Sequence, residues 1–192
     1  MESEIRKLKN CKEWNALTEK YSPSEVLQYF DFKEAVRFAD TILNSDPRND
    51  ALLSWGIKFL FLIKNKFPQE WNKDWMLSAY LSFWCELAYM YLESYKILKE
   101  AVDFSEDPSP TLLYLFGHCC KFPPEIDLMS EEERAKWFKQ SLSKQVTYEA
   151  AHALSFVTEN RNLKEYWKSV SEEAEITHSH IESIGPKILE EI

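Results

Sequence analysis

Glycine is scarce in this chain: only three of its 192 residues are glycine, and its eight prolines fall between periodic segments. Both residues mark turns, and strands alternate apolar and polar side chains, which no segment here does for long. Long stretches without either residue are typical of helices. The sequence therefore predicts an all-α protein, an irregular array or bundle of about eight to ten helices, folded as a single domain over residues 1–192 with a short tail from residue 185.

An excess of basic side chains is also lacking. The chain has 23 Lys and Arg against 32 Asp and Glu, a formal net charge of −9. Nucleic-acid binding draws its affinity from clustered Lys and Arg. The charge balance therefore argues against DNA or RNA as a partner.

Segments that would place the chain in a membrane or an oxidising compartment are missing too. No apolar run approaches the roughly 20 residues that span a bilayer, and residues 1–21 lack the apolar stretch of a secretory signal. No Cys-x-x-Cys spacing occurs, which favours reduced, buried thiols over disulfides. We expect a cytoplasmic protein without a membrane span. Its four cysteines are Cys11, Cys85, Cys119 and Cys120.

Sequence motifs of catalysis are absent: there is no Gly-rich phosphate loop, nucleophile elbow or zinc-protease motif. The pair His178 and His180, with Glu175 and Glu182 nearby, has metal-ligand residue types. Residues two apart on a helix point about 200° apart, however, so these imidazoles cannot easily share a metal. A solvated helix surface is the reading we favour for this pair.

Two further histidines invite a catalytic interpretation. In His118-Cys119-Cys120 a base and possible nucleophiles are adjacent, but they point to different faces of an apolar helix that does not favour a thiolate. His152 is best explained as a hydrogen-bonded helix residue. We expect no catalytic residue, no metal and no cofactor. A helical-bundle metal protein or hydrolase stays open as an alternative, because carboxylates of distant helices can converge.

Two segments of the chain share the same spacing of an Asp-Pro pair and a glycine. The pair ending at Pro47 is followed by Gly56, and the pair ending at Pro108 by Gly117, an offset of 61 residues. Proline suits the first turn of a helix, and glycine in an apolar run lets a neighbouring helix approach. The spacing predicts two helices that each start near the proline and pack closely at the glycine.

Helix starts and ends can be placed along the rest of the chain. Three capping boxes, in which a polar residue is followed three positions later by Glu, mark helix starts: Ser22 with Glu25, Asp31 with Glu34, and Ser130 with Glu133. Residues 69–105 exceed the usual helix length and should form two helices broken near 90–93. Further expected helices cover residues 2–20, 131–142, 143–158 and 163–183, the last stopped by Gly185 and Pro186.

Residues 33–61, which read KEAVRFADTILNSDPRNDALLSWGIKFLF, resemble the join between two tetratricopeptide repeats. Ala35 and Pro47 have the spacing of the family's early Ala and its repeat-starting Pro. A second join, residues 99–122, keeps Ala101, Pro108 and Gly117 but has a shorter interval from Ala to Pro. The offset of 61 differs from the family's period of about 34.

The resemblance implies stacked helix hairpins with a concave groove that binds a peptide or a helix of a partner. Small acidic proteins with such repeats include chaperones of bacterial type III secretion systems. A secretion-system component is therefore one partner that the resemblance implies.

Aromatic residues make up 15% of the chain, more than a minimal core requires. Trp71 and Trp75 lie four positions apart among polar neighbours, and Tyr80 and Trp84 follow; these four are candidate partner-binding residues, because Trp and Tyr dominate interface hot spots. Packing in the core is the alternative, and it is the interpretation that the sequence favours. We expect a non-enzymatic protein–protein interaction module, an adaptor or a chaperone, and a self-associating structural subunit stays open.

Overall fold

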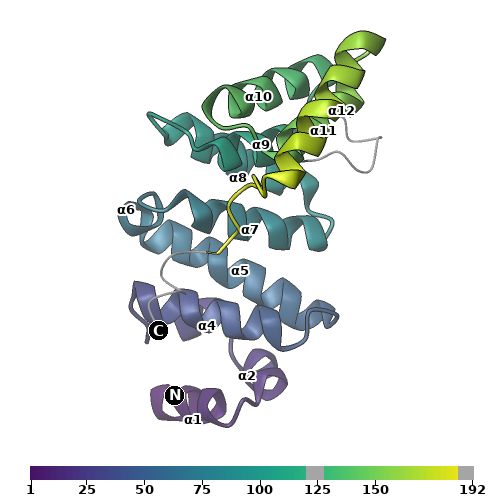
Figure 1. Ribbon diagram of the computed structural model, residues 1–192. Coiled ribbons are helices and arrows are strands. Elements are labelled where there is room, and N and C mark those ends of the chain that lie inside the picture. The colour runs from purple at the N-terminus through teal and green to yellow at the C-terminus, as the bar shows by residue number, and fades with distance from the viewer. Residues whose placement is uncertain (120–127, 186–192) are drawn as a thin grey trace. The chain divides into compact units, whose positions relative to one another are not determined.

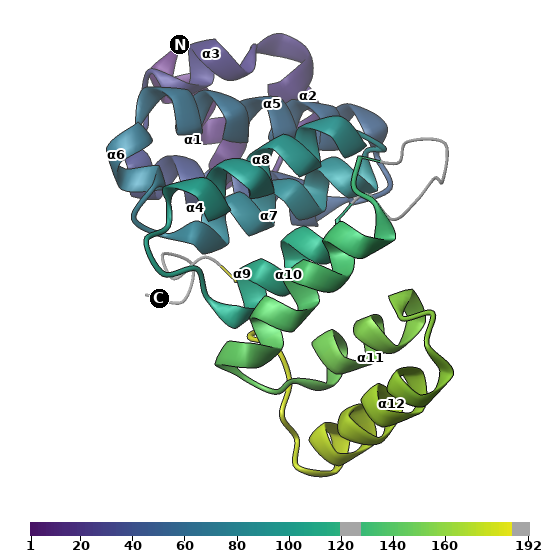
Figure 2. The same ribbon diagram turned by 90° about the horizontal axis from the view of Figure 1, so that it is seen from above.

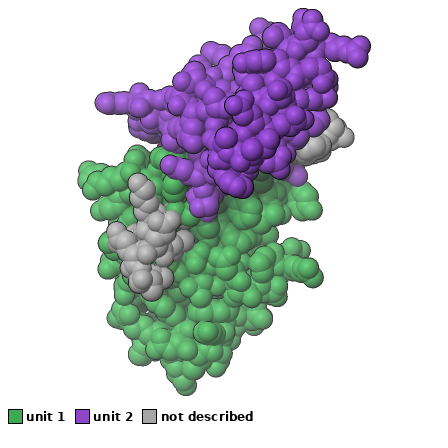
Figure 3. Space-filling model, viewed as in Figure 1, with its two compact units in different colours: residues 1–89, 185–192 green, residues 90–184 purple. Residues whose placement is uncertain are grey.

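The fold is described from a computed structural model that covers residues 1–119 and 128–185 (Figure 1). These two ranges contain twelve helices and no strand, which confirms the all-α class. Cys120 and Pro186 fall outside the described residues. The chain divides into two compact units, Met1–Tyr89 and Met90–Ile184 (Figure 3).

The first unit is built around α5, which packs against α2, α3, α4 and α7. Phe38 of α4 stacks on Phe30 with ring centres 5.0 Å apart and meets the edge of Phe59 of α5 at 5.6 Å. Because neighbours cover α5 on several sides, its apolar residues lie nearly all round the helix. The helices of this unit are α1 Glu2–Asn10, α2 Trp14–Lys20, α3 Pro23–Leu27, α4 Phe32–Ser45, α5 Asp50–Lys66, α6 Pro68–Trp71 and α7 Trp75–Leu87.

In the second unit each helix packs against the next along the chain, and α9 also touches α11 (Figure 2). Buried side chains of α10 and α11, among them Phe138 and Leu154, form its core, and Trp167 of α12 packs against them. The helices are α8 Tyr91–Phe104, α9 Pro110–His118, α10 Glu131–Lys144, α11 Tyr148–Val157 and α12 Arg161–Ile176.

Both glycines of the repeated spacing lie at close helix contacts, as predicted. A Cβ built on Gly56 of α5 would lie 2.6 Å from Leu43 Cδ2 of α4. One built on Gly117 of α9 would lie 2.9 Å from Phe138 Cε1 of α10. The two contacts are not equivalent, because Gly56 is in the second helix of its pair and Gly117 in the first.

Capping chemistry places most helix starts. All three predicted capping boxes are present at α3, α4 and α10. The prediction that Pro47 starts a helix is wrong, because Asn49 accepts hydrogen bonds from the backbone N–H groups of Ala51 and Leu52 and so caps α5 at Asp50. In the same way, Asp74 accepts from Met76 N and separates α7 from α6, a break that the sequence did not predict.

Three helices end at a residue other than glycine in the left-handed conformation: Lys12, Tyr89 and His178, with φ of 57°, 59° and 53°. The expected single helix over residues 2–20 is therefore two helices, separated at Lys12. Lys12 N donates to Lys9 O and Glu13 N to Leu8 O, the two bonds of a Schellman motif. Tyr89 marks the second break within residues 69–105, close to its predicted place.

In the described part of the chain, no helix combines the length and apolar character that crossing a membrane requires.

Replacing Gly56 by Ala should lower the free energy of unfolding by up to about 2 kcal/mol. The added Cβ clashes with Leu43, at a cost of about 1–3 kcal/mol, and this outweighs a gain of about 1 kcal/mol in helix propensity. Urea denaturation followed by circular dichroism measures the difference.

Ser54→Ala, at an exposed position of the same helix, is the matched control and should be neutral or slightly stabilising. In the Gly56→Ala background, Leu43→Ala should cost less than in the wild type, because the clashing atoms are gone. A Gly56→Ala protein at least as stable as the wild type would contradict the close contact.

Candidate functional site

Three of the four aromatic residues predicted to bind a partner are buried in the first unit. Trp71, Tyr80 and Trp84 expose 0%, 7% and 3% of their surface, and only Trp75 is half-buried. Trp71 Nε1 donates to Ser78 Oγ at 3.0 Å, so even its polar atom is satisfied inside the fold. These side chains cannot anchor a partner while the core is intact. The structure thus corrects the expectation of an exposed aromatic face here, in favour of the core alternative.

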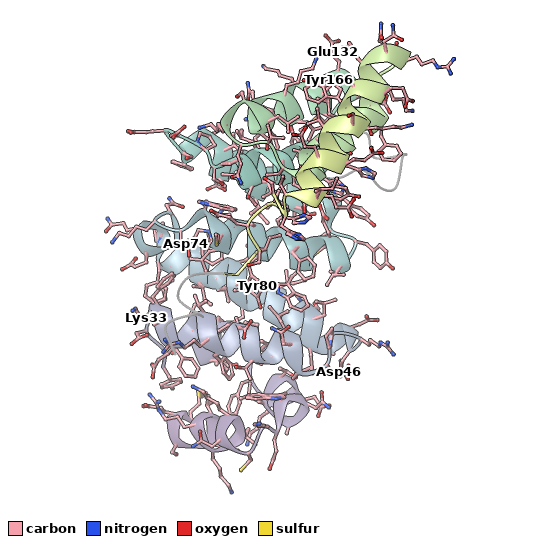
Figure 4. All side chains as sticks on the ribbon, in the orientation of Figure 1. Lys33, Asp46, Asp74, Tyr80, Glu132 and Tyr166 are labelled. Atoms are coloured by element: carbon pink, nitrogen blue, oxygen red, sulfur yellow. The ribbon has the colours of Figure 1, made fainter. Side chains whose placement is uncertain are left out.

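Tyr80 belongs to a hydrogen-bonded group that joins α7 to α4 (Figure 4). Its hydroxyl donates to Asp40 Oδ1 at 2.7 Å, and Asn44 Nδ2 donates to the same oxygen at 2.8 Å. Burial, followed by the hydrogen bond to Asp40 and the charge of Asp40, raises the pKa of Tyr80 far above its ordinary value. The group therefore has a structural role, because an ionised Tyr80 would be disfavoured at this place.

The cysteine and histidine near the end of α9 differ in exposure. Cys119 is buried and His118 is exposed. Arg134 of α10 is buried beside them, and its Nη1 donates to Gly117 O at 3.0 Å and Cys119 O at 2.8 Å. A guanidinium at a helix C-terminus satisfies carbonyls that have no partner within the helix. Across residues 1–119 and 128–185, no three His, Cys, Asp or Glu side chains gather in a way that could hold a metal ion.

His178 and His180 lie beyond α12, which corrects the helix predicted over residues 163–183. His178 is left-handed, its N–H donates to Glu175 O, and Ser179 N donates to Ala174 O at 2.8 Å. These bonds form a Schellman motif in which His178 takes the place usually held by glycine. The chain leaves the helix here and turns back toward α11 and α9.

The segment that follows is a short irregular stretch, residues 179–182, which we call the strap (yellow in Figures 1 and 2). It binds the start of α11 through its backbone: Tyr148 N donates to Ser179 O at 2.8 Å, and Ile181 N donates to Glu149 Oε2 at 3.0 Å. It reaches α9 as well, where Glu182 N donates to Thr111 Oγ1 at 3.0 Å.

Glu149, in the first turn of α11, is the centre of these contacts. Its second carboxylate oxygen accepts a hydrogen bond of 2.9 Å from His180 Nδ1. Burial, followed by the negative charge of Glu149, raises the pKa of Tyr114 on α9 to about 12. One carboxylate therefore bonds two successive strap residues and acts electrostatically on α9.

Aromatic rings continue from the strap along α11. Tyr148 stacks on His152 with ring centres 5.1 Å apart, and His152 meets the edge of Phe156 at 4.8 Å. His152 is exposed and Phe156 has 57% of its surface exposed. We call Thr111, Tyr148, Glu149, His152 and Phe156 the strap face. It combines hydrogen-bonding groups for an extended backbone with partly exposed rings.

The sequence predicted a hydrogen-bonded helix residue at His152 and gave no indication of the rest of this face. The sequence prediction extended the last helix through the strap, because no glycine or proline marks a helix end just before residue 179. The contact from Glu182 to Thr111 spans 71 residues of sequence and leaves no local signal.

Substituting Glu149 by Gln should lower the pKa of Tyr114 below its value of about 12, while burial keeps it above the ordinary value of 10.0. Tyr114 favours its neutral form in the fold, so its contribution to stability is complete below pH 10 and is lost as the pH rises toward 12. The variant should lose less stability over this range. Titration of the Tyr114 Cζ resonance by NMR measures the pKa. Glu159→Gln, at the far end of α11, is the control, and an equal shift in both variants would contradict the placement of Glu149.

Comparisons with known proteins found no family model, no curated protein and no solved structure that matches this chain.

Proposed function

We propose that this protein is a non-catalytic interaction module, an adaptor or chaperone of the cytoplasm, whose strap face binds an extended segment of a partner protein. The ligand we propose carries Lys or Arg beside small polar and apolar residues. The consecutive packing of α9, α10, α11 and α12 supports the proposal, because stacked helices of this kind are what the tetratricopeptide resemblance implies.

The observation that carries the proposal is the way the strap itself is held. The strap face bonds the backbone of the strap through a helix N–H, a carboxylate and a hydroxyl, which belong to Tyr148, Glu149 and Thr111. Contacts to backbone groups do not depend on the identity of the bonded residues, so the same donors and acceptors suit an extended peptide from another chain. The partly exposed rings of His152 and Phe156 lie on the same helix as Tyr148 and Glu149.

Charge supports the choice of a basic partner. Residues 90–184 have 17 acidic and 10 basic side chains, whereas residues 1–89 have 13 and 12. Nearly all of the net negative charge therefore belongs to the unit that contains the strap face. A negative field raises the encounter rate with positively charged segments.

The proposal predicts that the strap face binds the strap sequence in trans. The probe is a synthetic peptide of residues 177–184, THSHIESI, and the protein is the full chain in which Ser179→Gly, His180→Ser, Ile181→Gly and Glu182→Ser remove the strap's side-chain contacts. The peptide should bind this variant, and it should bind the wild type about tenfold more weakly, because the wild-type strap is tethered to the face and competes at high effective concentration. Fluorescence anisotropy of the labelled peptide measures both affinities.

Two controls make this result specific. The scrambled peptide IHSETSHI keeps the backbone but not the order of the side chains that correspond to Ser179 and His180, so it should bind more weakly. Adding Thr111→Val and Glu149→Gln to the variant should weaken binding of THSHIESI. Circular dichroism confirms that each protein retains its helices. No binding of THSHIESI to the variant would refute the function we propose.

Charge added to the peptide should change its affinity in a salt-dependent way. THSHIESI extended by two Lys at each end should bind the variant more tightly than the same peptide extended by two Glu, because the second unit is acidic. Raising the salt concentration to about 0.5 M should reduce the difference, since exposed charges are screened. Equal affinities of the two extended peptides at low salt would refute the proposal that the partner segment is basic.

A further inference from the structure

Thr147 is in the position of the N-cap of α11 but does not act as one. Its side chain makes no capping hydrogen bond, and its hydroxyl is buried without a partner, with 1% of the residue exposed. Threonine at an N-cap usually accepts a hydrogen bond from the N–H two or three residues on, here Glu149 N or Ala150 N. A buried hydroxyl without a hydrogen bond is unfavourable.

The strap takes over part of this capping role. Ser179 O accepts the hydrogen bond of Tyr148 N, the first helical N–H, and Ser179 Oγ donates to Val146 O at 2.5 Å. These two contacts lie on either side of Thr147 in the sequence. Glu149, the next residue of the first turn, directs its carboxylate to His180 and Ile181 instead of to its own helix.

We propose that the strap is an autoinhibitory segment whose release is assisted by an exchange of caps at the start of α11. In the closed state Ser179 O bonds Tyr148 N and the Thr147 hydroxyl is unpaired. In the open state the Thr147 hydroxyl accepts from Glu149 N or Ala150 N, and Tyr148 N and the Glu149 carboxylate become available to a partner. The regulatory meaning of this exchange rests on the peptide-binding function proposed above.

The exchange explains how a segment with several hydrogen bonds can still be displaced. Opening breaks the bonds of the strap, but it forms one N-cap and removes one buried unpaired hydroxyl. An N-cap bond alone shifts an equilibrium by about fivefold. A partner peptide then replaces the strap's bonds with its own, so the face exchanges one extended segment for another.

The test substitutes Thr147 in the full chain and follows hydrogen exchange of the Ile181 and Glu182 amides by NMR. Thr147→Val keeps the shape of the side chain but removes the hydroxyl. The closed state then no longer contains a buried unpaired hydroxyl, and the open state loses its N-cap. Exchange of both amides should slow by about fivefold or more. Thr147→Ser, which retains a hydroxyl, should behave as the wild type.

A second substitution keeps the test decisive if Thr147→Val does not fold. Thr147→Asp supplies a stronger N-cap in the open state, whereas its charge would be buried beneath the closed strap at a cost. Hydrogen exchange of the Ile181 and Glu182 amides should therefore accelerate about tenfold or more. Thr158→Val, at the other end of α11, is the matched control; its hydroxyl donates to Leu154 O, so it should change global stability without selective effect on the strap.

If the strap amides exchange hydrogen at the wild-type rate in both Thr147→Val and Thr147→Asp, the proposed exchange of caps is overturned. A change that is equal at Leu154 and at Ile181 would overturn it too, because this would report global unfolding. Neither measurement involves a ligand. Failure of THSHIESI to bind the strap-replaced chain would therefore refute the peptide-binding function alone, and unchanged amide exchange would refute the exchange of caps alone.

Discussion

The close contact of α9 with α10 at Gly117 determines where the other parts of the second unit can lie. A side chain at this position would meet Phe138 and the Cβ of Trp137, so only glycine allows the two helices to approach this far. Because α10 also packs on α11, the same helix holds α9 and α11 as neighbours. The strap depends on that arrangement, since it bonds Thr111 of α9 and Glu149 of α11 within two consecutive residues.

The two units use their aromatic and charged residues differently. In the first unit the rings of Trp71 and Tyr80 are buried, and their polar atoms bond partners inside the fold. The second unit carries most of the acidic excess, and 57% of the surface of Phe156 is exposed there. A rich aromatic composition thus supplies both buried core residues and partly exposed rings.

Local signals predicted the helical class, the three capping boxes and the two close glycine contacts, because each is marked in the sequence by residue types a few positions apart. The helix ends at Lys12 and His178 were not predictable in this way, since both use the left-handed conformation at residues that rarely adopt it. Trp71 was misjudged because its sequence neighbours are polar, while its partner Ser78 lies seven residues away. The strap face depends on the meeting of α9, α11 and the segment after α12, which no short stretch of sequence encodes.

The strap also changes how the second unit would respond to a mechanical load. Most contacts in this unit join consecutive helices, so tension applied at the end of the chain would ordinarily peel away α12 first. Residues 181 and 182 are instead hydrogen-bonded to Glu149 and Thr111. These bonds lie between the pulled end of the chain and α12. A force applied after residue 184 is therefore carried to α11 and α9 before it reaches the last helix. The segment that we propose to occupy the binding face would then be the first to yield under tension.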